Sequence, residues 1–183
     1  MRITVTTQPE PLVTLEEAKV ALGEIGTSDR DELITSLILA AQAELDGPKG
    51  WVGISVAQQS VEVCFDSFAG CISLPAGPII EPVMVTYLDS DGTEQTLTDT
   101  TYTLLTDGRL VLTPNESWPG TYSRAEAVTV AYNVGIADEA DPRIALMKTA
   151  IILHVRMTLD HEDVDKRRET INWLVSPMKV WAV

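Results

Sequence analysis

The expected fold is decided by a stretch with two parts: Val128-Thr129-Val130-Ala131-Tyr132-Asn133-Val134-Gly135, followed closely by Asp141-Pro142-Arg143-Ile144. The spacing of the hydrophobic residues changes between the two parts. In the first part, large apolar residues alternate with polar or small ones, as in a half-buried strand. The second part places an N-cap aspartate before a proline at the first helical position, a strong start signal for a helix. Apolar residues then continue at helical spacing through Ile144, Met147, Ile151, Val155 and Leu159. A β-region therefore ends here and a long helix begins.

Upstream of this stretch, the sequence pattern is typical of strands back to about Val56. Val61 and Val63 alternate with polar residues, and further short apolar runs follow. Two tight-turn signals, Asp89–Gly92 and Thr106–Gly108, separate these runs. We therefore expect a small antiparallel β-unit of roughly six or seven strands.

Two helices are predicted before the β-unit. The first follows Thr14-Leu15-Glu16-Glu17, a capping box in which the Thr14 side chain accepts from a backbone amide and the Glu17 side chain reaches back. The second begins near Ser28, carries acidic residues in its first turn and ends at Gly47-Pro48. Its apolar positions form a stripe along one face: Leu33, Ile34, Leu37, Ile38, Ala41 and Leu45.

A fourth, shorter helix is expected near Val164–Leu174, ended by Ser176-Pro177. A two-helix hairpin buries its apolar stripe poorly alone, so the simplest arrangement packs the first two helices against the last two. The predicted fold class is α+β, mainly an α-helical bundle of about four helices with a small antiparallel β-unit inserted in it. The expected boundaries are residues 1–50 for the N-terminal helices, 51–136 for the β-unit and 137–183 for the C-terminal helices and tail.

The net charge of −14 over 183 residues is the unusual feature of the composition. Hydrophobic residues at 45% and charged residues at 22% are ordinary for a globular fold, so disorder is not expected. Binding to DNA phosphates needs clustered lysine and arginine, and the charge argues against it. Residues 1–153 hold 22 acidic and 8 basic side chains, whereas residues 154–183 hold 5 of each. The acidic surplus therefore lies wholly before residue 154.

The sequence also indicates the cellular compartment of the protein, through its targeting signals and its cysteines. No apolar stretch approaches the roughly 20 residues needed to span a bilayer, so no membrane association is expected. The N-terminus, Met1-Arg2-Ile3-Thr4-Val5, lacks the pattern of a signal peptide, which predicts a protein made and kept in a cytoplasm. Cys64 and Cys71 could face each other across a hairpin, but a reducing compartment favours two buried free thiols.

Short motifs along nearly the whole chain resemble, in order and spacing, those of one family. The first motif is Pro11-Leu12-Val13-Thr14-Leu15-Glu16-Glu17-Ala18-Lys19, which is followed by a predicted helix that begins with acidic residues and ends in glycine. It resembles the opening of head–tail connector proteins of long-tailed phages. These are also called adaptor or head-completion proteins, and relatives occur in prophages and gene transfer agents. The later matches are Ile72–Ile80, Val85–Gly92, Trp118-Pro119, Val128–Gly135, Asp141–Ile144 and Trp173–Pro177. The charged segment from Asp160 to Glu169 departs from the family, whose members often carry aromatic residues there.

The resemblance implies a structural subunit of the virion neck that is not an enzyme and uses no cofactor or metal. About twelve copies would form a ring under the portal protein of the filled head. The ring would extend the DNA channel, let DNA pass without specific binding, and offer an attachment surface to a stopper or tail-completion protein. Such a protein is made in the host bacterial cytoplasm. In the family the C-terminal segment commonly engages the portal, which implies these docking residues here: Trp173, Leu174, Pro177, Met178, Lys179, Val180 and Trp181.

Two physical arguments are consistent with that role, and each has a plainer alternative. An acidic channel would repel phosphates and keep the duplex sliding, although acidic surface also simply maintains solubility. An apolar tail with Trp181 suits an interface, since tryptophan is favoured as an interface anchor, but it could also pack on its own helices.

Three other motifs suggest chemistry that we discount. His154 and His161 lie two helical turns apart, but a metal site needs three or four convergent ligands, so they are interpreted as surface or helix-end histidines. Asp89-Ser90-Asp91-Gly92 resembles the start of a calcium loop without its later ligands and is interpreted as a turn. The basic run Lys166-Arg167-Arg168, flanked by acidic residues, is interpreted as a salt-bridged helix face, with a portal or neighbour contact as the alternative.

Three rival functions fit the sequence less well than the connector does. A stopper or tail-completion protein of the same neck would be mainly a β-barrel, and the predicted helices argue against it. A small-molecule-binding or hydrolytic domain would need a polar cluster, and the sequence has no phosphate loop or nucleophile elbow. An acidic DNA mimic would space its charges regularly, whereas these charges lie in turns and helix caps.

Overall fold

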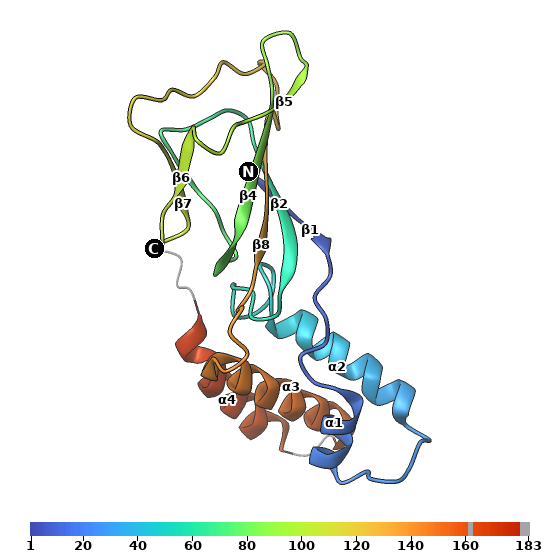
Figure 1. Cartoon of the computed structure of the whole chain (residues 1–183). Coiled ribbons are helices and arrows are strands. Elements are labelled where there is room, and N and C mark those ends of the chain that lie inside the picture. Colours follow the sequence, from blue (N-terminus) through green and yellow to red (C-terminus); the bar gives the residue numbers. More distant parts are fainter. Residues whose placement is uncertain (161–162, 180–183) are drawn as a thin grey trace. The chain divides into compact units, whose positions relative to one another are not determined.

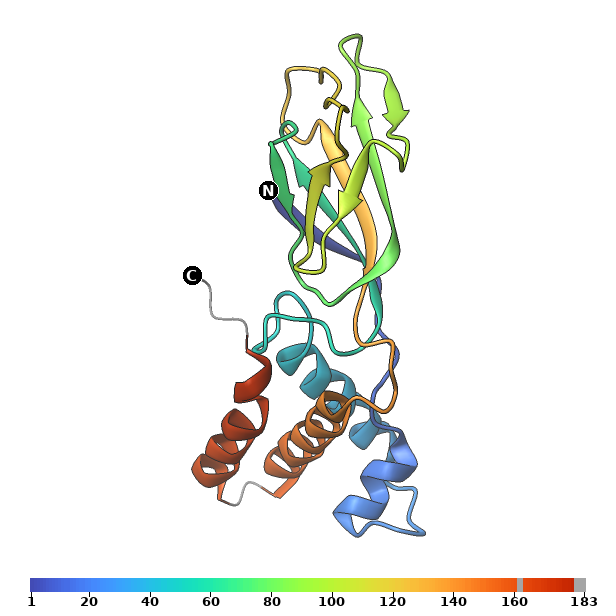
Figure 2. The same ribbon diagram turned by 60° about the vertical axis from the view of Figure 1, so that its left-hand side comes forward.

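The computed structural model describes residues 1–160 and 163–179, and the chain divides into two compact units (Figures 1 and 2). One unit contains the strands and comprises Met1–Pro9 and Gln58–Gly135. The other contains the helices and comprises Glu10–Ala57 and Ile136–Val183. The chain therefore passes from one unit to the other three times.

The β-unit holds two antiparallel sheets. One has five strands in the order β1-β2-β8-β4-β5, and the other has three in the order β3-β7-β6. Their bounds are β1 (Arg2–Thr7), β2 (Gln59–Phe65), β3 (Cys71–Ser73), β4 (Ile79–Leu88), β5 (Glu94–Thr96), β6 (Tyr102–Leu104), β7 (Arg109–Leu112) and β8 (Val128–Val134). The alternating stretch that predicted a strand is β8, which lies at the centre of the larger sheet.

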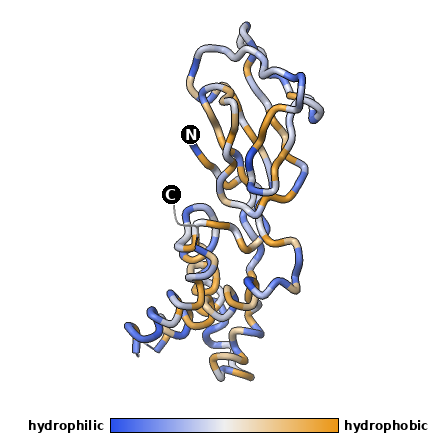
Figure 3. Tube along the Cα trace, turned by 90° about the vertical axis from the view of Figure 1, so that its left-hand side faces the viewer, coloured by the Kyte–Doolittle hydropathy of each residue, from blue (hydrophilic) through white to orange (hydrophobic). Residues whose placement is uncertain are grey.

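The β-unit has a hydrophobic core of its own. Val61 and Val63 on β2 and Val130 on β8 are fully buried, whereas Glu62, between the two valines, is only half-buried. This alternation places one face of the five-stranded sheet inward. Leu110 of β7 is equally buried and belongs to the same core, so the smaller sheet covers that face. Apolar segments accordingly run through the strands as well as the helices in Figure 3.

The helical unit consists of α1 (Leu15–Leu22), α2 (Asp31–Leu45), α3 (Pro142–Asp160), α4 (Val164–Val175) and a short 3-10 turn, η1 (Ser176–Met178). The long helix α3 packs against each of the other three helices. It lies between α4 on one side and α1 and α2 on the other (Figures 1 and 2). The residues of α3 that are buried in this core are Met147, Ala150, Ile151 and Val155.

The starts of α1 and α2 test the predicted helix signals. The capping box of α1 is confirmed: the Glu17 amide donates to Thr14 Oγ1 at 3.2 Å, and the Thr14 amide donates to Glu17 Oε2 at 2.8 Å. The second helix begins at Asp31 rather than near Ser28. The reason is local, because the Asp31 amide closes a turn onto the Ser28 carbonyl at 3.2 Å before regular helix begins.

The prediction of a mainly α-helical bundle is wrong. Helices make up 32% of the described residues and strands 24%, and the β-unit is a two-sheet body with its own core. The sequence pattern predicts less β-structure than the structure has, for two reasons. Arg2–Thr7 falls in residues 1–50, which the sequence pattern assigns to the N-terminal helices, yet it pairs with β2 as an edge strand. β5 has no buried position at all, so it carries no alternating pattern to recognise.

The two cysteines lie in different sheets. Cys64 on β2 is buried and free, as predicted. Cys71 on β3 is also free but exposed, contrary to the prediction. It precedes the buried Ile72 on a three-residue strand, and the period of two therefore turns its side chain to the outer face.

Candidate functional site

The loop after α2 is organised by one buried carboxylate, Asp46. Its Oδ1 accepts from the amides of Gly47 at 2.9 Å and Val56 at 2.6 Å, and its Oδ2 accepts from the Ala57 amide at 3.0 Å. Burial raises the pKa of the Asp46 carboxyl above its ordinary value, and the three amide donors oppose that rise. Because both ends of the loop are tied to one side chain, residues 46–57 have a fixed shape.

This loop presents Trp51 to the C-terminal segment. The Trp51 amide donates to the Glu44 carbonyl at 2.8 Å, which holds the residue against the end of α2. The Lys179 ammonium lies 4.6 Å from the centre of the Trp51 ring, within the range of a cation–π contact. Lys179 Nζ also donates to Asn172 Oδ1 at 2.6 Å. The described C-terminus is therefore anchored to the loop, and Trp51 is a residue of this surface that sequence reasoning missed.

The residues predicted to dock a portal occupy the end of α4 and η1, and their exposures differ. Trp173 is 74% exposed on the outer face of α4, and Pro177 is also exposed. Met178 is buried within the helical unit. Leu174 and Lys179 are half-buried, and Val180 and Trp181 lie outside the described residues. The structure therefore brings five of the seven positions to one end of the helical unit.

Beside this segment lies an open groove of about 460 Å³. It is lined by Trp51, Asp165, Arg168, Glu169 and Asn172. Carboxylates, a guanidinium and an indole meet there, which suits contact with a polar protein segment better than with an apolar ligand.

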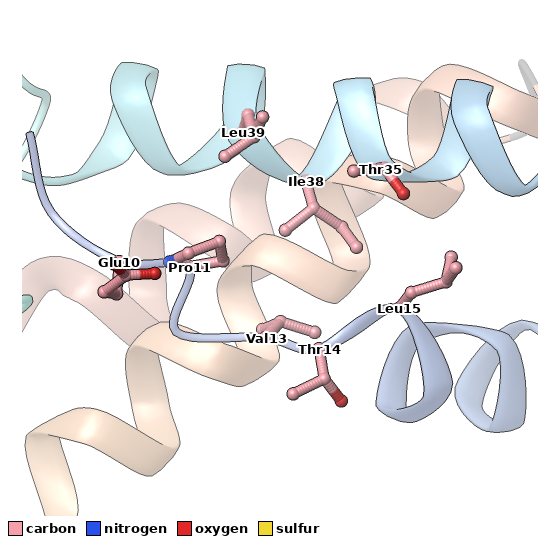
Figure 4. A pocket seen from close by; sticks show the side chains of 8 residues that line it. All are labelled: Glu10, Pro11, Val13, Thr14, Leu15, Thr35, Ile38 and Leu39. Atoms are coloured by element: carbon pink, nitrogen blue, oxygen red, sulfur yellow. The ribbon is translucent and has the colours of Figure 1, made fainter.

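A second groove lies on the other side of α3, between the chain leading into α1 and the helix α2. Its volume is about 290 Å³. Figure 4 shows its lining side chains: Glu10, Pro11, Val13, Thr14, Leu15, Thr35, Ile38 and Leu39. The Gln42 side chain fixes one wall, because it donates to the Glu10 carbonyl at 2.9 Å and accepts from the Leu12 amide at 2.8 Å.

The three discounted motifs can be located in the structure. Asp89 Oδ1 accepts from the amides of Asp91 and Thr93, both at 3.0 Å, so the predicted turn is confirmed. Its pKa is lowered by the hydrogen bond from the Gln95 side chain and by these amides. Within residues 1–160 and 163–179, no group of three or more histidine, cysteine, aspartate or glutamate side chains could hold a metal ion. His154 Nε2 lies 3.0 Å from Glu44 Oε2, and His161 lies outside the described residues.

The basic run is part of an ion-pair network, as predicted. Arg167 Nη1 lies 3.4 Å from Asp160 Oδ2 and donates to the Arg156 carbonyl at 3.1 Å. Lys166 Nζ lies 3.6 Å from Asp163 Oδ1, and both side chains are largely exposed. Among the described residues, no helix is long and apolar enough to cross a membrane.

Solved structures resemble the whole chain. No protein-family model matches the sequence. No curated protein matches it either. A chain in the neck of the empty gene transfer agent (GTA) particle, computed with C6 symmetry, superposes with a TM-score of 0.72, covering 100% of this chain and 97% of that one at 14% identity. The fold is that of a GTA neck chain. A chain of the native GTA virion gives a TM-score of 0.70, and one of the native GTA neck, computed with C12 symmetry, gives 0.66; both have the same coverage and identity as the first.

Proposed function

We propose that this protein is a head–tail connector (adaptor) subunit of a phage or phage-like particle. The observation that carries the proposal is the match of fold with a GTA neck chain, which covers 100% of this chain and 97% of that one. About twelve copies form a ring under the portal protein, complete the filled head and extend the DNA channel. The ring gives the stopper or tail-completion protein its attachment surface, and the subunit is made in the host bacterial cytoplasm.

The portal-docking surface in this proposal is the C-terminal segment at the end of α4 and η1. It comprises Trp173, Leu174, Pro177, Met178, Lys179, Val180 and Trp181. Trp51 is added to this set, because it holds Lys179 and borders the adjoining groove. An exposed tryptophan beside a pre-formed, anchored surface is the arrangement that protein interfaces favour.

The role is structural, with no catalysis and no cofactor. The net charge of −14 supports passage of DNA without binding, because an acidic channel repels phosphates. A stopper or tail-completion protein of the same neck is the second candidate. The helical unit favours the connector, since four helices in the described chain are more than a β-barrel protein needs.

The experiment is negative-stain microscopy of the protein mixed with its portal. We expect a ring that caps one end of the portal. A truncation after Lys179 keeps the buried Met178 and the Trp51 contact but removes Val180 and Trp181, and we expect it to fold and to bind portal at least tenfold more weakly. The matched control is Arg124→Ala in the β-unit, which should bind normally. Absence of any ring or portal complex, or unchanged binding by the truncation, contradicts the respective part of the proposal.

A further inference from the structure

Two polar side chains are buried at the C-terminal end of α2. Gln42 lies in the last turn of the helix, and Asp46 directly follows the helix. Their exposed fractions are only 4% and 6%. Burying such groups costs free energy unless their polar atoms find hydrogen-bond partners. The proposed function uses neither side chain, so the reason for their burial lies in the backbone that they bind.

Gln42 holds the first point at which the chain crosses between the two units. This crossing lies between Pro9 and Glu10. The amide nitrogen of the Gln42 side chain donates to the Glu10 carbonyl at 2.9 Å, and its oxygen accepts from the Leu12 amide at 2.8 Å. The chain is therefore fixed to α2 as soon as it enters the helical unit.

Asp46 holds the second crossing, which follows Ala57, and through it the third, which precedes Ile136. Its carboxylate accepts from the Val56 amide at 2.6 Å and from the Ala57 amide at 3.0 Å. The Val56 carbonyl in turn accepts from the Ile136 amide at 3.0 Å. All of these hydrogen bonds lie within the helical unit. One end of α2 therefore holds all three crossings.

Very little chain lies between these hydrogen bonds and the strands. Two residues separate the end of β1 from Glu10, and one residue each separates Ala57 from β2 and β8 from Ile136. One of these linker residues is Pro9, whose ring fixes its φ angle. Another is Gly135, whose amide donates to the Pro78 carbonyl at 2.9 Å. Relative motion of two units is the default expectation, but it needs hinge residues that can change φ and ψ. Three short linkers that are held at their ends offer few such residues.

We propose that Gln42 and Asp46 form a clamp that restricts the motion of the β-unit relative to the helical unit. Both are positioning residues, because they act through the backbone of the three crossings. A buried polar network whose members all have partners makes the backbone that it binds more rigid. The clamp is a conformational role of the chain by itself, and it goes beyond the proposed function.

The test measures distances between the two units by pulsed electron paramagnetic resonance on spin-labelled protein. One label is attached to Cys71, the exposed native thiol of the β-unit, and the other to Val20→Cys, at a position that is 65% exposed on α1. Cys64 is buried, so it should take no label. An excess of unlabelled protein removes the distances between copies. The width of the distance distribution then reports how freely the two units move.

Gln42→Glu and Asp46→Asn keep the shapes of the side chains but break the clamp. A carboxylate cannot donate to the Glu10 carbonyl, and an amide nitrogen cannot accept from the backbone amides that Asp46 binds. We expect each variant to widen the distance distribution about twofold or more, because motion between units is the default once the linkers are released. Unchanged widths in two folded variants would overturn the clamp.

Two controls separate the clamp from a general loss of structure. Gln95→Glu makes the same chemical change in the β-unit, where the Gln95 side chain donates to Asp89 Oδ2 at 2.9 Å, and should leave the distribution as in wild type. A second pair of labels, Val20→Cys and Trp173→Cys in a Cys71→Ser background, lies wholly in the helical unit. Widening confined to the pair that joins the two units supports the clamp. Equal widening of the pair within the helical unit contradicts it, because Gln42 and Asp46 would then only maintain the fold of that unit.

Hydrogen exchange of the wild-type protein tests the clamp even if both variants fail to fold. The amides of Leu12, Val56 and Ala57 should exchange as slowly as those in the core of α2, and exchange as fast as in an exposed loop would overturn the clamp. Neither measurement uses a portal or a ring. A negative result therefore leaves the connector function standing, and failure of the connector function leaves the clamp standing.

Discussion

The Tyr132 hydroxyl on β8 donates a 2.8 Å hydrogen bond to the carbonyl oxygen of Pro75. Pro75 lies in the segment that leads from β3 of the smaller sheet to β4 of the larger one. The bond therefore ties the central strand of one sheet to the chain that connects the two. Burial raises the pKa of Tyr132 far above its ordinary value, so the hydroxyl stays a donor throughout the pH range in which the protein is handled.

Replacing Tyr132 by phenylalanine keeps the ring in the core and removes only the hydroxyl. The Pro75 carbonyl loses its donor, and we expect a loss of about 1–2 kcal/mol in the free energy of unfolding. Urea denaturation measures it. Tyr122→Phe, at a residue 45% exposed, is the control and should change stability by less than about 0.5 kcal/mol. Equal losses in the free energy of unfolding for the two variants would show that the Tyr132–Pro75 hydrogen bond contributes nothing to stability.

The loop after α2 predicts a strong requirement for glycine at one position. A Cβ on Gly50 would lie 2.3 Å from the Asp46 carbonyl oxygen, which belongs to backbone held by the Asp46 hydrogen bonds. Gly50→Ala must therefore distort the loop, and we expect a loss of about 2 kcal/mol or more. The matched control is Gly70→Ala, where a Cβ meets nothing within 4 Å and the change should be neutral or slightly stabilising. Thermal unfolding of the two variants should separate them clearly, and similar melting temperatures would contradict the loop geometry.

Local signals predicted more of this protein than long-range ones did. The capping box of Thr14 and the Asp141-Pro142 start of α3 depend on neighbours a few residues away, and the structure has both helices beginning there. The pairing of Arg2–Thr7 with β2 joins residues some sixty positions apart, and no local pattern specifies it. For the same reason the Trp51–Lys179 contact could not be read from the sequence: it depends on how a loop and a distant helix end meet.

The exposure of the two cysteines predicts how they react with a thiol reagent. Cys71 is exposed on an edge strand, whereas Cys64 is buried between β1 and β8. A thiolate must be accessible to react, so one thiol per chain should react promptly in the native protein and the second only after unfolding. Titration with a chromogenic disulfide checks this. Cys71→Ser should abolish the prompt reaction, and a prompt reaction of both thiols in wild-type protein would contradict the burial of Cys64.

The start of α1 predicts a dependence of stability on pH. The pKa of Glu17 is lowered, first by the Thr14 amide and then by the Lys148 ammonium, which lies 2.9 Å from Glu17 Oε1. A lowered pKa means that the folded state favours the ionised carboxylate, so its stabilisation is fully present above the unfolded value near 4.5. It is lost as the pH falls through the lower folded value. The Glu17 side chain is well exposed, so solvent screening limits the effect to about 0.5 kcal/mol or less.

Glu17→Gln keeps the shape of the side chain and removes its titration. At pH 7 the wild type should therefore be the more stable protein. Its advantage in the free energy of unfolding should shrink as the pH falls below about 4.5, where Glu17 of the unfolded chain begins to bind a proton, and should be lost as the pH falls through the lower folded pKa. Urea denaturation at a series of pH values measures the difference. Glu16→Gln changes the same charge one residue away, where the described part of the chain offers the carboxylate no capping bond or ion pair, and should give a smaller difference at pH 7. A Glu17→Gln difference that stayed constant with pH would mean that the carboxylate charge adds nothing to the capping box.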